Sequence, residues 1–216
     1  MEYDVIVVGK GNAALCAALS AQENGAKVLV LEAASEAEHG GNSRFAGGVM
    51  RFAYETVDDL RRVTDITDEE AANSDFGTNT TDEFFDVLFR LTSFRTDADL
   101  SEILVTQSLD TMAWLRAKGA RFILNHGRQS GMVNGKRVYF GNMPIEANGG
   151  GAGLVQYLDQ AAQKNGIAIQ YDTRVSSLIF DGERVSGVRA QQQGKPVELR
   201  AKSVVLACGG FEANPE

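Results

Sequence analysis

The hydrophobic positions of this chain change their spacing several times, and the first fifty residues show the simplest pattern. Val5 to Val8 form a continuous apolar run that stops at Gly9, and a second apolar run spans residues 27–33. Short apolar runs without alternation are typical of strands buried on both faces, while the alanine- and leucine-rich stretch between them, which closes at Gly25, predicts a helix. The pattern predicts a βαβ unit with parallel strands and a right-handed connection.

The middle of the chain has a different pattern. Residues 53–118 are polar, with apolar positions at helical spacing, which predicts several amphipathic helices. Residues 120–148 are rich in turn-forming residues, and they favour a loop with short strands at residues 121–125 and 136–141.

Regular elements are expected again after the glycine run at residues 149–151. A helix is predicted over residues 152–166, followed by alternating residues from about 169 to 201 with a hairpin turn at Asp181-Gly182. A last buried strand is predicted from residue 203. The whole pattern predicts an α/β, Rossmann-like, doubly wound domain with a helical insertion at about 53–118 and a small antiparallel β-meander at about 169–201.

Charge and cysteine content narrow the class of protein. The formal net charge of −8 disfavours nucleic acid or an anionic membrane surface as a partner. The first residues lead directly into an apolar run that is too short to cross a membrane, so we expect neither a signal peptide nor membrane insertion. Cys16 and Cys208 match no metal-ligand spacing, which predicts no metal site and favours a reducing, cytoplasmic setting.

The loop after the first apolar run has the composition of a dinucleotide site. Gly9, Gly11 and Ala14 occupy the three small positions of G-x-G-x-x-G/A. The first allows a tight turn, the second lets the main chain approach a pyrophosphate, and the third permits close helix packing. Glu32 ends the second strand, where a carboxylate accepts hydrogen bonds from ribose hydroxyls and disfavours a 2′-phosphate. The alternative is a glycine-rich turn with an incidental Glu.

A second glycine tract, "HGGNSRFAGG", spans residues 39–48. Gly40-Gly41 and Gly47-Gly48 flank a short polar segment, although glycine loses more freedom on folding than any other residue. We interpret the tract as bare backbone against which a flat ring lies. A flexible surface loop is the alternative interpretation.

Four segments carry a resemblance to a known family: "VVGKGNAALCAALSAQENGAKVLVLEA", "GGNS" followed by "AGG", "GGGAGLV", and "VVLACGGFEANPE". In this order they resemble the FAD-binding part of the fumarate reductase/succinate dehydrogenase flavoprotein superfamily, and within it the branch of the tricarballylate dehydrogenases. The resemblance implies FAD as the cofactor and a glutathione-reductase-type FAD-binding domain over residues 1–216. It also implies that this domain is incomplete and that the capping, substrate-binding domain is absent.

The resemblance implies cofactor contacts at particular positions of this chain. The set is Gly9, Gly11, Asn12 and Ala13 at the pyrophosphate, Glu32 and Ala33 at the adenosine ribose, Gly40, Gly41, Asn42, Ser43, Gly47 and Gly48 at the flavin and its ribityl chain, Arg174 and Val175 at the adenine, and Ala207, Cys208, Gly209 and Gly210 on the diphosphate side.

Three positions depart from the family pattern. Lys10 stands where smaller residues are commoner, although this position of the motif is free to vary. Cys208 replaces a usual Thr, and we expect it to be a small packed side chain. Covalent members have a His directly before the Ser or Thr of the second tract. Here Asn42 precedes Ser43 and His39 is displaced by three residues, so non-covalent FAD is expected.

The resemblance implies an FAD-dependent dehydrogenase or reductase that acts on a C–C bond next to carboxylates, in a tricarballylate- or fumarate-like substrate. The partners expected are this small carboxylate, an unidentified electron donor or acceptor, and a second copy of the chain in a homodimer. The family's catalytic His and Arg residues are expected beyond Glu216, so the catalytic residues stay unknown. Arg44, His126, Arg128 and Arg137 are weak candidates, each with ordinary surface charge as the alternative.

Three other functions stay open on the sequence. The chain could be an FAD-binding module without catalysis of its own, or part of a ketosteroid dehydrogenase-like flavoenzyme. Glu32 alone would also permit an NAD-dependent enzyme, although the second glycine tract and the motif at residues 207–210 argue against it.

Overall fold

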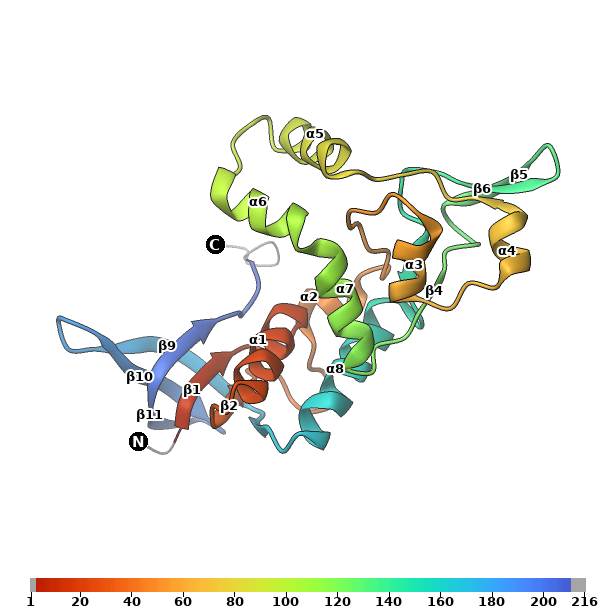
Figure 1. Cartoon of the computed structure of the whole chain (residues 1–216). Helices are drawn as coiled ribbons and strands as arrows, with labels where there is room; N and C mark the ends of the chain where they lie inside the picture. Colours follow the sequence, from red (N-terminus) through yellow and green to blue (C-terminus); the bar gives the residue numbers. More distant parts are fainter. Residues whose placement is uncertain (1–2, 211–216) are drawn as a thin grey trace. The chain divides into compact units, whose positions relative to one another are not determined.

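The computed structural model describes residues 3–210, which form two compact units (Figure 1). Within the described residues, the first unit is made by residues 3–46 and 151–210, and the second by residues 47–150. The backbone therefore leaves the first unit after Ala46 and returns to it at Gly151.

The first unit is built on one six-stranded sheet with the strand order β8-β2-β1-β11-β10-β9. Its first four strands are parallel neighbours, while β10 pairs antiparallel with both β11 and β9. The strands are β1 (Tyr3–Val8), β2 (Val28–Leu31), β8 (Ala168–Gln170), β9 (Thr173–Phe180), β10 (Val185–Gln192) and β11 (Lys195–Leu206). The parallel pairing of β1 and β2 confirms the α/β fold that the sequence predicts.

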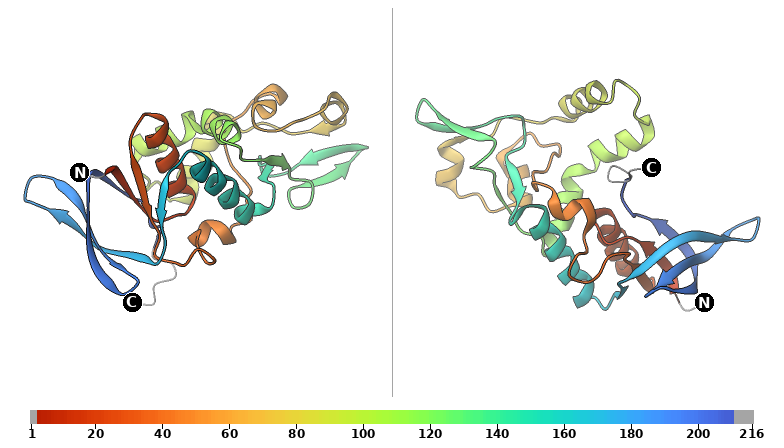
Figure 2. Two further views of the ribbon diagram at one scale, coloured as in Figure 1. Left: turned by 90° about the horizontal axis from the view of Figure 1, so that it is seen from below. Right: turned by 180° about the vertical axis from the view of Figure 1, so that it is seen from behind.

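The strand β11 joins the parallel and antiparallel parts of the sheet. Its first half pairs antiparallel with β10, as in Val197 opposite Ala190, and its second half pairs parallel with β1, as in Val205 opposite Val7. The sequence pattern instead suggests one strand that ends near residue 201 and another that starts at 203. The meander also differs at its start, because β8 pairs with β2 and not with β9. Figure 2 shows the β9–β10 hairpin extending beyond the parallel strands.

Three helices lie in the described part of the first unit. α1 (Asn12–Glu23) connects β1 to β2 and buries Ala14, Leu15, Ala18 and Leu19, while α8 (Gly150–Lys164) precedes β8. The short α2 (Gly41–Phe45) forms within the second glycine tract, where the sequence analysis predicts no helix. A buried cluster on one face of the sheet contains Ile6, Val8, Leu29, Leu31, Val188 and Ala201.

The second unit contains five helices within the range where the helical insertion is expected: α3 (Val57–Val63), α4 (Asp68–Ala72), α5 (Thr81–Leu91), α6 (Ala98–Thr106) and α7 (Ser108–Ala117). The first three begin at capping boxes. In each, a Thr hydroxyl accepts a hydrogen bond from the main-chain N–H three residues later, and the acidic side chain of that later residue accepts one from the main-chain N–H of the Thr. The pairs are Thr56–Asp59, Thr67–Glu70 and Thr80–Glu83.

Two small sheets complete the second unit. One has the order β3-β6-β5, from β3 (Ser74–Asp75), β6 (Lys136–Tyr139) and β5 (Ser130–Val133), and the other pairs β4 (Phe122–Leu124) with β7 (Ile145–Ala147). β4 and β6 lie where the sequence predicts short strands, while β5 and β7 lie in residues that the sequence assigns to a loop. Within residues 3–210, none of the helices combines the length and apolar character needed to cross a membrane.

Candidate functional site

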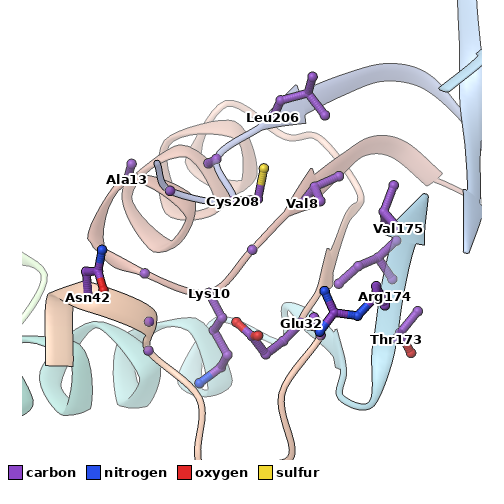
Figure 3. A pocket seen from close by; sticks show the side chains of 18 of the residues that line it. Val8, Lys10, Ala13, Glu32, Asn42, Thr173, Arg174, Val175, Leu206 and Cys208 are labelled. Carbon is purple, nitrogen blue, oxygen red and sulfur yellow. The ribbon is translucent and has the colours of Figure 1, made fainter. Parts of the chain in front are cut away.

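One pocket of about 850 Å³ lies in the first unit, at the ends of β1, β2 and β11. This volume is within the range of small-molecule and cofactor sites. The sequence-predicted residues that line it are Gly9, Gly11, Asn12, Ala13, Glu32, Ala33, Gly40, Gly41, Asn42, Ser43, Arg174, Val175, Ala207, Cys208, Gly209 and Gly210. Figure 3 shows Asn42 at one end of the pocket and Arg174 with Val175 at the other, with the glycine turn between them.

Gly9 makes the turn that closes β1. Its φ of +103° is a conformation that side-chain-bearing residues rarely adopt, and an added Cβ would lie 2.5 Å from the carbonyl oxygen of Ala207. The Ala207 N–H donates to the Val8 carbonyl at 2.9 Å, so the end of β11 is fixed directly against this turn. Glycine is therefore required here by both backbone conformation and space.

The N-terminus of α1 opens into the pocket. Its N-cap is Gly11, which has no side chain to cap the helix. Ser43 stabilises the first turn instead, because its Oγ accepts a hydrogen bond from the Asn12 N–H at 3.1 Å. A helix N-terminus favours negative charge through its dipole and its N–H groups. The buried Oδ1 of Asn12 has no hydrogen-bond partner within the described part of the chain, which leaves an acceptor for a ligand hydroxyl or N–H.

Glu32 lies directly after β2, at the edge of the same pocket. Its Oε1 accepts from the Ala34 N–H at 2.8 Å, which fixes the carboxylate on a short turn. The main chain of Glu32 is held on both sides, because its N–H donates to Gln170 O at 2.8 Å and its carbonyl accepts from Thr173 N at 2.9 Å. This geometry gives a pre-positioned acceptor of the kind that binds ribose hydroxyls.

The second glycine segment contributes only its first half to the pocket. Gly40 and Gly41 have φ values of +105° and +50° and lead into α2, whose Asn42 and Ser43 line the site. Gly47 and Gly48 belong to the second unit and are outside the lining. An added Cβ at Gly47 would lie 2.5 Å from Nη1 of Arg128, the mobile end of a long side chain in the second unit.

The far end of the pocket is formed by two strands. Arg174 and Val175 lie at the start of β9, the edge strand of the described sheet, where alternate main-chain groups face away from β10. Leu206 and Cys208 approach from the end of β11 (Figure 3). The exposed Cys208 is not the packed side chain that the sequence suggests.

The comparisons with known proteins agree with this site. The sequence matches a family described as "FAD binding domain" over residues 4–216. The chain belongs to this family. A cytochrome-type fumarate reductase of Shewanella frigidimarina is 30% identical over 218 residues, which cover 99% of this chain and 34% of that protein. An NADH:fumarate oxidoreductase of Klebsiella pneumoniae is 32% identical over 213 residues, covering 98% of this chain and 21% of that protein.

Solved structures show the same fold. A 3-ketosteroid-Δ4-(5α)-dehydrogenase from Rhodococcus jostii RHA1 matches with a TM-score of 0.74 and 26% identity, covering 97% of this chain and 46% of that one. A flavocytochrome c3 fumarate reductase matches with a TM-score of 0.71 and 28% identity, covering 98% and 34%. The FAD-binding domain therefore spans less than half the length of these proteins. The predicted superfamily, fold and cofactor are confirmed.

Sequence reasoning missed a buried charged cluster beneath this FAD-binding site. Lys10, in the variable position of the glycine motif, is only 1% exposed. Its Nζ forms an ion pair with Oδ1 of Asp159 on α8, lies 3.1 Å from Nδ1 of His39, and sits 5.3 Å from the ring centroid of Tyr171. The partners are distant in sequence from Lys10, so no local pattern could reveal them.

The cluster affects the ionisation of His39. Burial, followed by the positive charge of Lys10, holds the pKa of His39 below its usual 6.5. Asp159 and Glu32 act in the opposite direction, and Arg44 adds to the lowering. Because the Lys10 ammonium can only donate, Nδ1 of His39 accepts this hydrogen bond in the neutral imidazole.

The weak catalytic candidates have structural partners. Nη1 of Arg44 donates to Ala37 O at 2.7 Å in the first unit. In the second unit, His126 Nδ1 lies 2.9 Å from the Tyr139 hydroxyl, Arg137 Nη1 donates to Ser130 Oγ at 3.0 Å, and Arg128 Nη1 donates to Gly47 O at 3.4 Å. Across residues 3–210, no cluster of His, Cys, Asp and Glu has the arrangement of a metal site.

Proposed function

We propose that this FAD-binding domain is part of an FAD-dependent oxidoreductase that reduces or oxidises a C–C bond next to a carboxylate, in a fumarate- or tricarballylate-like substrate. The observation that supports it best is a single pocket that combines the Gly9–Gly11 turn, the open N-terminus of α1, the fixed Glu32 carboxylate and the Gly40–Ser43 segment. The names of the two fumarate-reducing relatives support the substrate class.

The residues of the pocket fit the parts of FAD in order along its length. In this proposal the Gly9–Gly11 turn and the α1 N-terminus bind the pyrophosphate, and Glu32 binds the adenosine ribose. Arg174 and Val175 contact the adenine, while Asn42 and Ser43 approach the flavin side. Asn12 Oδ1, a buried acceptor with no partner among the described residues, accepts a hydrogen bond from the cofactor.

The chemistry divides between cofactor and protein. When bound, FAD supplies hydride transfer at its isoalloxazine ring. The residues of this domain orient the cofactor and shield its phosphates, and we propose that the groups that bind the carboxylate and move the proton lie in sequence outside these 216 residues. The length of the relatives supports this, because the chain covers 34% of the Shewanella protein. In this view residues 1–216 form one cofactor domain, with the substrate-capping domain elsewhere.

We propose that the cofactor is bound non-covalently. The nearest histidine to the flavin-side segment is His39, and its Nδ1 is already engaged by Lys10 at 3.1 Å. A cytoplasmic setting and a homodimer remain predictions of this proposal. Sedimentation velocity at tens of micromolar protein tests the homodimer, and a single monomer boundary would contradict it.

A ketosteroid-type substrate is the second candidate, and the TM-score of 0.74 with the Rhodococcus dehydrogenase favours it. An FAD-binding module without catalysis is the third. The decisive experiment starts with the absorbance spectrum of the desalted protein after addition of FAD. Flavin bands that remain after desalting, and flavin released by acid, establish non-covalent binding. Protein that stays colourless at every FAD concentration would contradict the proposal.

Substrate class is then tested on the gene product that contains this domain. Reoxidation of the reduced flavin by fumarate or aconitate-type acids, but not by 3-ketosteroids, is the expected result. Reoxidation by steroids alone would favour the second candidate, and no reoxidation by either class would favour the module.

A further inference from the structure

Lys10 ties together segments that are distant in the sequence. It lies in the glycine turn after β1, and its side chain points away from the α1 N-terminus to the side of the loop where α8 lies (Figure 3). There it meets Asp159 of α8 and His39, the residue directly before Gly40-Gly41. The Tyr171 ring covers the ammonium from the segment that follows β8, 5.3 Å from its centroid.

One face of α8 contacts the same segment along its length. The N–H of Gly151 donates to Ala46 O at 2.9 Å, and a Cβ at Gly151 would overlap the Ser43 carbonyl oxygen. One turn later, a Cβ at Gly40 would lie 3.1 Å from Cγ1 of Val155. Asp159 follows after one more turn, so positions four apart share this face. α8 therefore supports residues 40–46 at one end and Lys10 at the other.

A buried ammonium is retained only where its charge is compensated. The Lys10 side chain is inaccessible, while that of Asp159 is 14% exposed, and His39 offers the second acceptor. Removing one partner of such a pair leaves an uncompensated buried charge, whereas replacing both partners by apolar groups is often tolerated. The stability of the fold and the placement of the His39–Ser43 segment can therefore be separated by mutation.

We propose that Lys10 is a positioning residue, which fixes the Gly40–Ser43 segment against the α1 N-terminus through its ion pair with Asp159 and its hydrogen bond to His39. On the pocket side, the same two segments also meet at Ser43, whose Oγ accepts a hydrogen bond from the Asn12 N–H at 3.1 Å. The expected effect of Lys10 on FAD affinity rests on the proposed function. Its expected effect on the mobility of the Gly40–Ser43 segment does not.

The test compares Lys10→Met with Lys202→Met, a matched variant in the same unit. Lys202 also pairs with an aspartate, Asp4, at 2.6 Å, but its side chain is 67% exposed. Two quantities are measured: the Kd for FAD, and hydrogen exchange of the amides of residues 40–46 in cofactor-free protein. Lys10→Met should raise both the Kd and the exchange rate on the order of tenfold, because the loss of one hydrogen bond to a charged group changes an equilibrium constant by about that factor. Lys202→Met should change neither.

The double variant Lys10→Met/Asp159→Leu separates the positioning role from an effect on stability. It also replaces Lys10→Met in both measurements if that single variant fails to fold. Two apolar side chains should restore the unfolding midpoint but not the bond to His39, so weak FAD binding and fast exchange should persist. Wild-type affinity in the double variant, or unchanged exchange in Lys10→Met with only a lowered midpoint, would overturn the proposal. If wild-type protein binds no FAD while exchange still responds to Lys10→Met, the proposed function fails and the positioning role stands.

Discussion

The glycine turn after β1 gives the sharpest test of the structure. Gly9→Ala introduces a Cβ 2.5 Å from Ala207 O at a φ of +103°. The left-handed conformation costs roughly 1–2 kcal/mol for an L-residue, and forced overpacking adds about 1–3 kcal/mol. The free energy of unfolding should therefore fall by about 2–5 kcal/mol, a large part of the 5–15 kcal/mol typical of a folded protein.

Gly25→Ala is the matched control. Gly25 also has a positive φ, +85°, but an added Cβ there would meet no heavy atom within 4 Å. It should lose only the conformational part, about 1–2 kcal/mol. Urea unfolding of both variants, compared at equal m-value, measures the difference. Equal losses would refute the reasoning, because they would mean that the end of β11 moves away from the turn at little cost.

Three further predictions follow from the site. Glu32→Ala should weaken FAD binding on the order of tenfold, by loss of charge-assisted hydrogen bonds to the ribose, in a fluorescence titration; an unchanged Kd would remove Glu32 from the site. The pKa of His39 is lower in the folded protein than its usual 6.5 in the unfolded chain. As pH falls below 6.5, the unfolded chain therefore binds a proton at this residue more readily than the folded protein does. Stability should therefore decrease below about pH 6.5, and His39→Gln should flatten this dependence in urea unfolding at matched pH values; a dependence as steep as that of wild type would exclude His39 as its source. Burial raises the pKa of Cys16 to about 11, whereas Cys208 is exposed in the pocket. Iodoacetamide should therefore alkylate Cys208 alone, and bound FAD should slow the reaction. Labelling of Cys16 in folded protein would contradict the packing of α1.

The βαβ unit within residues 5–32 could be predicted correctly because the information that specifies it is local. The apolar run at Val5–Val8, the stop at Gly9 and the carboxylate at Glu32 each occupy their place through spacing within one βαβ unit. The strand β11 was harder to predict for a physical reason. Its periodicity changes from alternating to continuous where its neighbour changes from β10 to β1, and this change resembles the end of one strand and the start of another.

The charged cluster could not be predicted from any local pattern. A lysine in the variable position of a glycine motif is normally solvated, and only the approach of α8 and His39 makes Lys10 a buried residue.

The double pairing of β11 also determines when the pocket can form during folding. β1 finds β2 nearby in the sequence, but its other neighbour is distant, since Val5 pairs with Ser203. Contacts of such high sequence separation are slow to close, because the entropy of a long loop is lost before any pairing energy is gained. During synthesis the βαβ unit can therefore assemble early, while the glycine turn stays open until residues 195–207 have been made and paired. Cofactor capture is expected as a late step, after the strand that completes the sheet has docked.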